Sequence, residues 1–453
     1  MADELLIRAY DVGLGDCIFC RIPGGKKTAA GSDDFHILID CGSWSGMPYL
    51  QAAMKRLAED CKGRLDLVVV THQHKDHIAG FDPALFEGIS IGAIWMNCAM
   101  DPEHKQAKKS LALQGVATQA MRGLAAQGFA LTPEIQDLVG LFGIDNDGAM
   151  TTLRKTLPQK NNIKPTYVFA GQSGSKLGLP LAAGTEILVV GPEQDIDHFY
   201  LGKAVDTTLR GMMGAMGAAG AADGAGLATA AAAPAAEYPS NISAADFRQL
   251  RSRMLSSALA FAELSSKVTN NTSVVLLITW RGRRLLFVGD AEWGTDFKDG
   301  KSNGAWNTMW KMSKDKTKLL DDPIDFLKIG HHGSENATPW NDQQDGAQTE
   351  PAAILDAILP LPQGGAQPKA RAVVSTERSK YKTIPRGALL VELGKRVSGT
   401  KNYSKAFESK GLQISSIAKF EFEKEFIEAD QPLRTDLERL LGSPGYVDVT
   451  IAG

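Results

Sequence analysis

The segment that most constrains this chain is a run of apolar residues followed at once by a cluster of histidines. Residues 65–70 are mostly Val and Leu and contain neither Gly nor Pro, which predicts a buried strand. Directly after them come His72, His74, Asp76 and His77, in the spacing H-x-H-x-D-H. At the carboxyl end of a strand, imidazoles and a carboxylate can converge on a metal ion. A polar loop that is rich in histidine by chance explains this density of ligand-type residues less well.

Length and charge narrow the class of protein. A chain of 453 residues can hold two or three average domains, or one large domain with insertions. The formal net charge of −3 argues against a general polycation on nucleic acid, while a local basic groove stays open. No run of eighteen apolar residues occurs, so we expect no membrane partner. The acidic N-terminus predicts no secretory signal, and five cysteines without framework spacing predict reduced thiols in a cytoplasmic protein.

Apolar runs and turn signals predict that strands and helices alternate in two halves. This alternation favours a layered α/β architecture over an all-β barrel. A helix is expected over 48–61 and another over 387–393. The expected strands cover residues 5–10, 17–21, 36–42, 65–70, 91–96, 167–171, 186–192, 273–280, 285–290, 326–330, 371–375 and 446–451, with a Gly/Lys/Ser-rich link between the second and the third.

Two segments interrupt this alternation and are interpreted as insertions. The first, over residues 100–165, has a mainly helical pattern and no metal-ligand spacing. The second, over 200–268, contains a Gly/Ala-rich stretch at 211–236 with too few large apolar groups to build a core. A helix is expected from 243 to 266, where Ser is followed three residues later by Asp.

Two further strand ends carry ligand-type residues. Asp290 follows the apolar strand 285–288 and a Gly, and His331 with His332 follow the strand 326–330. Three such ends describe a site at a common sheet edge, where two divalent metals about 3.5–4 Å apart can share a bridging carboxylate. Asp290 is the candidate bridge. Neutral imidazole with carboxylate favours Zn²⁺, with Mn²⁺ or Fe²⁺ as alternatives when the carboxylate share rises.

These motifs resemble those of the metallo-β-lactamase-fold hydrolases and, more narrowly, of the hydrolase domain of the ComEC competence (DNA-uptake) family. The residues that carry the resemblance are Asp40, the histidine motif, and the stretches 11–17 (Asp-Val-Gly-Leu-Gly-Asp-Cys), 270–276, 286–291 and 327–334 (Leu-Lys-Ile-Gly-His-His-Gly-Ser). They extend from residue 5 to about 390. The resemblance implies one αββα four-layer sandwich over residues 1–453, with the two insertions inside it.

The resemblance also implies a role for each site residue. Asp76 and His332 are the catalytic candidates, with His332 as proton donor or phosphate contact. Asp40 would lie behind the metals and orient the histidine loop, residues 71–77. The implied ligands are His72 and His74 for the first metal, Asp76 and His77 for the second, and Asp290 between them. One of His331 and His332 would complete the second site, with His331 as the preferred candidate.

The chain departs from the family pattern at two positions. Many members have another histidine before the bridging carboxylate, where this chain has Asn270 or Asn271, so one prediction is that the first metal is weakly held or absent. Competence proteins commonly carry a Tyr-Gly-His-Pro stretch after the last strand. The corresponding residues 381–385 lack the histidine, and Lys382 is a candidate to bind an anion there. His36, inside an apolar strand, is expected to be structural rather than a ligand.

The expected reaction is hydrolysis by a metal-bound hydroxide, which attacks esters, amides and phosphodiesters alike. The competence-family resemblance favours a nuclease or phosphodiesterase acting on nucleic acid. Lys328 and Lys382 are candidate substrate contacts, and Ser334 could donate a hydrogen bond to a phosphate oxygen. Two alternatives stay open. One is a hydrolase of a small ester, lactone or thioester; the other is a metal-stabilised scaffold, without catalysis, that binds a protein partner through its insertions.

Overall fold

The computed structural model describes residues 3–108, 110–111, 114–115, 145–202, 262–340, 349–378, 381, 384–413 and 429–453. The Gly/Ala-rich stretch 211–236 and Lys382 lie outside these residues. The predicted helix over 243–266 also begins outside them, and a helical run over 262–271 contains its end.

The first of two large sheets is built mainly from the N-terminal part of the chain and closed by the last strand. Its order is β17-β1-β2-β3-β5-β7-β8, antiparallel from β17 to β3 and parallel from β3 to β8. The strands are β1 (Glu4–Tyr10), β2 (Cys17–Thr28), β3 (Gly31–Cys41), β5 (Leu67–Val70), β7 (Ile94–Asn97), β8 (Thr166–Val168) and β17 (Tyr446–Ala452).

The second large sheet repeats this plan with the order β16-β13-β12-β11-β10-β9. It is antiparallel from β9 to β11 and parallel from β11 to β16. An Arg281-Gly282 turn, with both residues at positive φ, joins β10 and β11 into a hairpin. The strands are β9 (Thr185–Gly191), β10 (Val275–Trp280), β11 (Arg283–Phe287), β12 (Phe326–Lys328), β13 (Arg371–Val374) and β16 (Leu433–Arg434).

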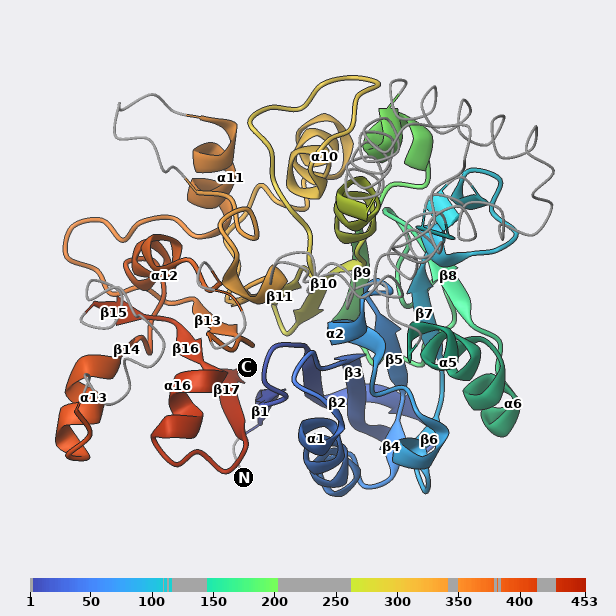
Figure 1. Cartoon of the computed structure of the whole chain (residues 1–453), viewed down its shortest axis with the longest axis horizontal. Helices are drawn as coiled ribbons and strands as arrows, with labels where there is room; N and C mark the ends of the chain where they lie inside the picture. Colours follow the sequence, from blue (N-terminus) through green and yellow to red (C-terminus); the bar gives the residue numbers. More distant parts are fainter. Residues whose placement is uncertain are drawn as a thin grey trace, which may run out of the picture.

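Helices cover the outer face of each sheet. In Figure 1, α1 (Met47–Asp60), α5 (Asp145–Thr151) and α6 (Leu157–Asn161) flank the first sheet, whereas α10 (Ala305–Met312) and α11 (Glu350–Ile358) lie by the second. The other helical segments are α2 (Lys75–Ile78), η1 (Pro83–Phe86), η2 (Cys98–Met100), η3 (Thr152–Thr156), η4 (Asp197–Leu201), η5 (Ser313–Thr317), η6 (His331–Gly333), α12 (Gly387–Gly394), α13 (Tyr403–Ser409) and α16 (Thr435–Leu440). Two small two-stranded sheets pair β4 (Arg64–Leu65) with β6 (Ser90–Ile91) and β14 (Lys401–Asn402) with β15 (Asp430–Gln431).

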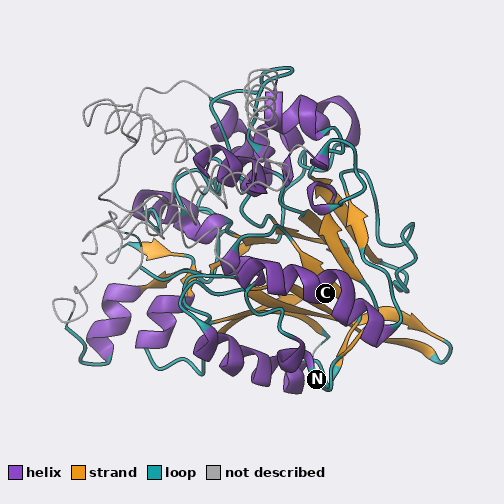
Figure 2. Cartoon of the chain, turned by 45° about the vertical axis from the view of Figure 1, so that its right-hand side comes forward, coloured by secondary structure: helices purple, strands orange, loops and turns teal. Residues whose placement is uncertain are grey.

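Three buried cores divide the molecule into four layers. One core lies between the sheets and joins side chains such as Ile18 and Leu276, and the other two lie between each sheet and its own helices. Figure 2 shows the strands in the middle with helices on both sides. The predicted αββα architecture is therefore confirmed, because each sheet buries both of its faces. No helix within the described ranges has the length and apolar character that crossing a membrane requires.

The sequence-based expectations miss two local features. The predicted link between residues 21 and 36 is instead the end of a long hairpin, in which Lys26 pairs with Asp33 and Thr28 with Gly31. The predicted strand 65–70 is interrupted at Asp66, whose carboxylate accepts hydrogen bonds from the Lys26 ammonium and a backbone amide. Both features depend on partners from a neighbouring strand, which an apolar pattern does not reveal.

Residues 145–161 of the first insertion belong to the outer helical layer of the first sheet. Residues 145–161 form one continuous helical segment through α5, η3 and α6, and Leu153 and Leu157 join the core beneath α1. The insertion boundaries themselves stay a prediction.

Candidate metal centre

The site lies where the parallel strands of both sheets end. Residues 71–77 follow β5, Asp290 follows β11, and His332 follows β12. Carboxyl ends of neighbouring parallel strands meet at one edge of a sheet. Because the two sheets pack face to face, the two edges lie together, and the three strand ends form one buried cluster.

Within the described residues the ligand-type side chains form three groups; one joins Asp16, Asp40 and His77, and the other two share one carboxylate. The ligand atoms of His72, His74 and Asp290 lie within 4.8 Å of one another, as do those of Asp76, His77, Asp290 and His332. His72 Nε2 is 3.7 Å from Asp290 Oδ2, and His77 Nε2 is 3.1 Å from Asp290 Oδ1. Each oxygen of Asp290 therefore faces one group, as a bridge between two metals requires.

Two buried atoms of this cluster have no hydrogen-bond partner. They are His74 Nε2 and Asp76 Oδ1. A buried polar atom that stays unpaired costs about 1–3 kcal/mol, so native structures rarely contain several at one place. Imidazole nitrogens and a carboxylate oxygen that converge in this way fit divalent metals of the zinc type. The residues present could therefore hold a metal.

The electrostatics of the two groups differ. Burial lowers the pKa of His72 well below its usual range and that of His74 to about 4, so both are neutral near pH 7, the form that binds metal. Burial acts the same way on His77, but the carboxylates of Asp290 and Asp40 outweigh it and raise its pKa well above the usual range. A metal that binds the second group must therefore displace a proton from His77.

Asp40 contacts two residues of the histidine loop, Thr71 and His77. It is fully buried, its Oδ1 accepts a hydrogen bond from the Thr71 backbone N–H (2.7 Å), and its Oδ2 accepts one from Thr71 Oγ1 (2.6 Å). The same Oδ2 lies 2.7 Å from His77 Nδ1. This contact keeps the proton on Nδ1 and leaves Nε2 toward Asp290, which fits the orienting role predicted for Asp40.

The structure places the two adjacent histidines differently from the sequence-based expectation. His332 is 1% exposed, and its Nε2 lies 3.0 Å from Asp76 Oδ2 within the second group. His331, the predicted ligand, lies at the rim with its side chain 24% exposed and its Nε2 3.8 Å from Asp290 Oδ2. Both residues have positive φ, and the turn between them sends one ring inward and the other outward. The geometry therefore favours His332 over His331, the preferred candidate of the sequence analysis, as the ligand of the second group.

Asn270 and Asn271 do not join either metal group. Asn270 Nδ2 donates to Glu292 Oε1 (2.8 Å), and Asn271 Oδ1 accepts from the Glu292 backbone N–H (3.2 Å). Glu292 is buried, and its Oε1 lies 3.5 Å from His331 Nδ1. The two asparagines therefore position Glu292 beneath the rim histidine. The sequence analysis did not include Glu292 among the site residues. Its position two residues after Asp290 was the available sign that it lies near the site.

Lys328 does not reach a substrate surface, contrary to its prediction. It is 2% exposed, and its ammonium donates to Asp16 Oδ2 (3.0 Å) and to the Ile329 carbonyl (3.0 Å). Asp16 is the last residue of the Asp-Val-Gly-Leu-Gly-Asp motif, and its Oδ1 lies 3.9 Å from His332 Nδ1. The predicted contact of Lys328 with substrate would require this buried pair to open.

Ser334 also has an internal partner. It is largely buried, and its hydroxyl donates to Asn336 Oδ1 (2.9 Å). Its predicted donation to a phosphate oxygen would require that bond to exchange. Lys382 lies outside the described residues, and the arginines of the β10–β11 turn lie at the opposite sheet edge, where Arg283 pairs with Asp325.

Glycines let the first loop of the chain pack on the histidine loop. A Cβ on Gly42 would lie 2.2 Å from the His77 amide nitrogen, and one on Gly15, which has a φ of +154°, would lie 2.9 Å from the Asp76 carbonyl oxygen. Asp16 N donates to that same carbonyl (2.9 Å). The Asp-Val-Gly-Leu-Gly-Asp motif therefore packs against the histidine loop.

Residues 29–87 match the sequence model of the metallo-beta-lactamase superfamily. The matched stretch runs from β3 into η1 and contains Asp40 and the whole histidine loop, whereas Asp290 and His332 lie beyond it. No curated protein matches the chain. Together with the buried His/Asp cluster, the match supports a metal-dependent hydrolase in general. The narrower likeness to the ComEC hydrolases stays a prediction.

Proposed function

We propose that this protein is a metal-dependent phosphodiesterase that cleaves nucleic acid. The observation that carries the proposal is the shared carboxylate of Asp290 between two buried groups of ligand-type atoms. Paired sites of this kind suit in-line displacement at phosphorus, because one can serve the attacking and the other the leaving oxygen. A divalent metal such as Zn²⁺ or Mn²⁺, when bound, supplies Lewis-acid polarisation and acidifies water.

The motifs that resemble the competence hydrolases support the choice of substrate. Asp16 of the first motif pairs with Lys328, and the last motif supplies His332 and the rim residue His331. These motifs therefore build the cluster itself, rather than a distant part of the fold. A likeness confined to structural loops would carry less weight about substrate.

Neighbouring groups orient the rings of the candidate metal ligands, and His331 is the polar side chain proposed for the substrate. Asp40 keeps a proton on His77 Nδ1, and the Ser375 carbonyl lies 3.0 Å from His332 Nδ1, so each ring offers Nε2 to the cluster. His331 sits at the rim above Glu292 and is the side chain proposed to contact the phosphoryl group. We therefore propose that His331 binds the substrate, whereas the sequence analysis predicted it as a metal ligand.

The test measures metal content and hydrolysis together. The protein is purified without chelator beside His74→Ala and Asp290→Asn, with His198→Ala as a matched control, because His198 is partly exposed and pairs with Asp299 away from the cluster. Each is assayed on bis-p-nitrophenyl phosphate, single- and double-stranded DNA, RNA and p-nitrophenyl acetate. We expect two metals and phosphodiester cleavage in the wild type and control, both lost in the two site variants.

Other outcomes discriminate the remaining classes. Metal-dependent hydrolysis of the acetate ester alone would replace the proposal by a small-ester hydrolase. One tightly bound metal without turnover on any substrate would replace it by a metal-stabilised scaffold.

A further inference from the structure

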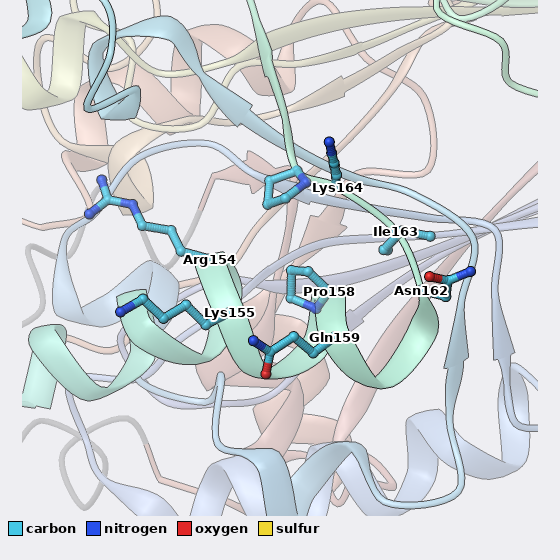
Figure 3. Close-up of a pocket in the computed structure, with 8 residues that line it drawn as sticks. Arg154, Lys155, Pro158, Gln159, Asn162, Ile163 and Lys164 are labelled. Atoms are coloured by element: carbon cyan, nitrogen blue, oxygen red, sulfur yellow. The ribbon is translucent and has the colours of Figure 1, made fainter.

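A basic hollow lies on the flank of the first sheet, outside the metal centre. It has a volume of about 420 Å³ and lies between the helical segment of η3 and α6 and the residues that lead into β8. Figure 3 shows Arg154 and Lys155 extending from the helical side and Lys164 from the opposite segment. None of the residues that line it is acidic.

The charge of this hollow departs from that of the chain as a whole. Residues 152–165 contain four Lys or Arg and no Asp or Glu, although the chain carries a formal net charge of −3. Lys160 has a structural use, since its ammonium donates to the Phe86 carbonyl. Lys155 and Lys164 are exposed and line the hollow. Cations gathered around a concave surface attract anions more strongly than cations scattered on a convex one.

Part of the lining of the hollow is apolar. Pro158, Ile163 and Pro165 line it beside the polar Gln159 and Asn162. A surface of this kind can cover the sugar or base of a nucleotide while the cations neutralise its phosphate. A simple inorganic anion would leave the apolar residues unused.

The hollow is connected to the metal centre through one rigid element. Asn146 in α5 donates its side-chain amide to the carbonyl of Gln73 in the histidine loop (3.1 Å). Arg154 lies eight residues further along the same helical segment, about 12 Å at 1.5 Å per residue. Its Nη2 donates to the Met100 carbonyl (2.6 Å), at the end of η2. A nucleic-acid strand rises about 3.4 Å per stacked nucleotide, so roughly three or four nucleotides span the separation of Asn146 and Arg154. Lys164 lies further away, because it leads into the amino end of β8, which is parallel to β7 and β5 and has its carboxyl end on the side of the metal centre.

We propose that the hollow holds the backbone of a single-stranded nucleic acid at a distance from the bond that is cleaved, on the same side of the first sheet as α5 and α6. The inference rests on the proposed function and adds a second binding site to it. Lys155 and Lys164 contact phosphates, and Arg154 forms the wall nearest the metal centre. Substrates long enough to reach the hollow bind more tightly than short ones.

The test compares Lys155→Ala/Lys164→Ala with the control Lys27→Ala/Lys176→Ala in the full-length, metal-loaded protein. Lys27 and Lys176 are exposed, and Lys27 lies in β2 at the end opposite Asp16. KM and kcat are measured on a long single-stranded oligonucleotide, a dinucleotide and bis-p-nitrophenyl phosphate. In the hollow variant, KM rises several-fold for the long strand only. The log–log salt dependence of its binding weakens by about 0.7 for each lysine removed.

Each outcome decides the inference separately from the proposed function. If both double variants cleave the long strand with wild-type KM, the hollow is not a nucleic-acid site, although the phosphodiesterase stands. If the wild type cleaves nothing, binding of labelled single-stranded DNA and RNA by anisotropy replaces kinetics, and wild-type affinity in the hollow variant overturns the inference. Competition by polyglutamate as strong as that by the oligonucleotide would also overturn it, because the hollow would then accept any polyanion.

Discussion

At the scale of single residues, the site depends on which atom of each histidine faces the cluster. Asp40 decides this for His77, because its carboxylate contacts Nδ1 and leaves Nε2 toward Asp290. Asp40 itself has a φ of 56°, in the left-handed region that Asn also adopts readily. The side chain can therefore be changed without changing the backbone.

Asp40→Asn is expected to weaken metal binding about 10- to 100-fold, as is usual when the group that orients a ligand histidine is altered. The amide loses the charge that holds the His77 proton in place. Competition against a chromophoric chelator measures the affinity. Thermal unfolding of the metal-free variant controls for the fold, and metal affinity equal to that of the wild type would show that Asp40 has no orienting role.

The two adjacent histidines give a second prediction at this scale. His332→Asn is expected to lose one bound metal, whereas His331→Asn keeps the full metal content and loses about tenfold in phosphodiester cleavage, the effect of one charge-assisted hydrogen bond worth about 1.5 kcal/mol. Asn suits the positive φ at both positions. Metal analysis and kinetics on the same samples provide the measurement, and loss of a metal from His331→Asn instead would restore the sequence-based assignment.

Sequence reasoning succeeded where chemistry follows an apolar strand, and failed where it depends on a turn or a distant partner. His72, His74 and Asp290 follow buried strands, so their convergence could be expected from the strands alone. Nothing in the spacing of His331 and His332 states which ring turns inward. Lys328 is paired with a carboxylate 312 positions away along the chain, a contact that only the fold creates.

At the scale of elements, the loop before β2 and the end of β3 form a seat for the short helix α2. Gly42 is the closest point, since a Cβ there would lie 2.2 Å from both the Asp76 carbonyl carbon and the His77 nitrogen. Backbone atoms cannot yield as the end of a flexible side chain can. The seat and the helix must therefore move apart if Gly42 gains a side chain.

Gly42→Ala is expected to lower the free energy of unfolding by about 1–3 kcal/mol, as overpacking does, and to weaken metal binding by displacing Asp76 and His77. Gly148→Ala is the matched control, because nothing lies within 4 Å of the Cβ that it adds in α5. That change should raise stability by about 0.5–1 kcal/mol, since Ala favours a helix over Gly. Urea unfolding measures both, and equal stability of the two variants would refute the packing argument.

At the scale of the whole molecule, side-chain contacts join the two sheets at the edge where the candidate metal centre lies. The buried ion pair of Lys328 on β12 with Asp16 before β2 is one tie, with an N–O distance of 2.9 Å. Removing one partner of a buried pair leaves an uncompensated charge and costs about 3–5 kcal/mol. Replacing both partners removes that charge.

Lys328→Met and Asp16→Asn are therefore each expected to destabilise the fold, and the double variant is expected to lose less than the sum of the two. Urea unfolding of the four proteins in a double-mutant cycle gives the coupling. Additive losses would mean that the pair does not act as a unit. Unchanged stability with a raised KM in Lys328→Met would restore its predicted contact with substrate.

The metal cluster is the second tie between the sheets, because His72, His74, Asp76 and His77 come from the first sheet and Asp290 and His332 from the second. A metal that binds only the folded chain stabilises it by about 4 kcal/mol at a thousandfold excess over its Kd. Chelation is therefore expected to lower the melting temperature of the wild type by several degrees and to leave Asp290→Asn almost unchanged, since that variant has lost the shared carboxylate. Calorimetry in zinc and in chelator makes the comparison. Equal melting of the wild type in both would mean that the two sheets hold together at this edge without a metal, and that the unpaired atoms of His74 and Asp76 have another partner.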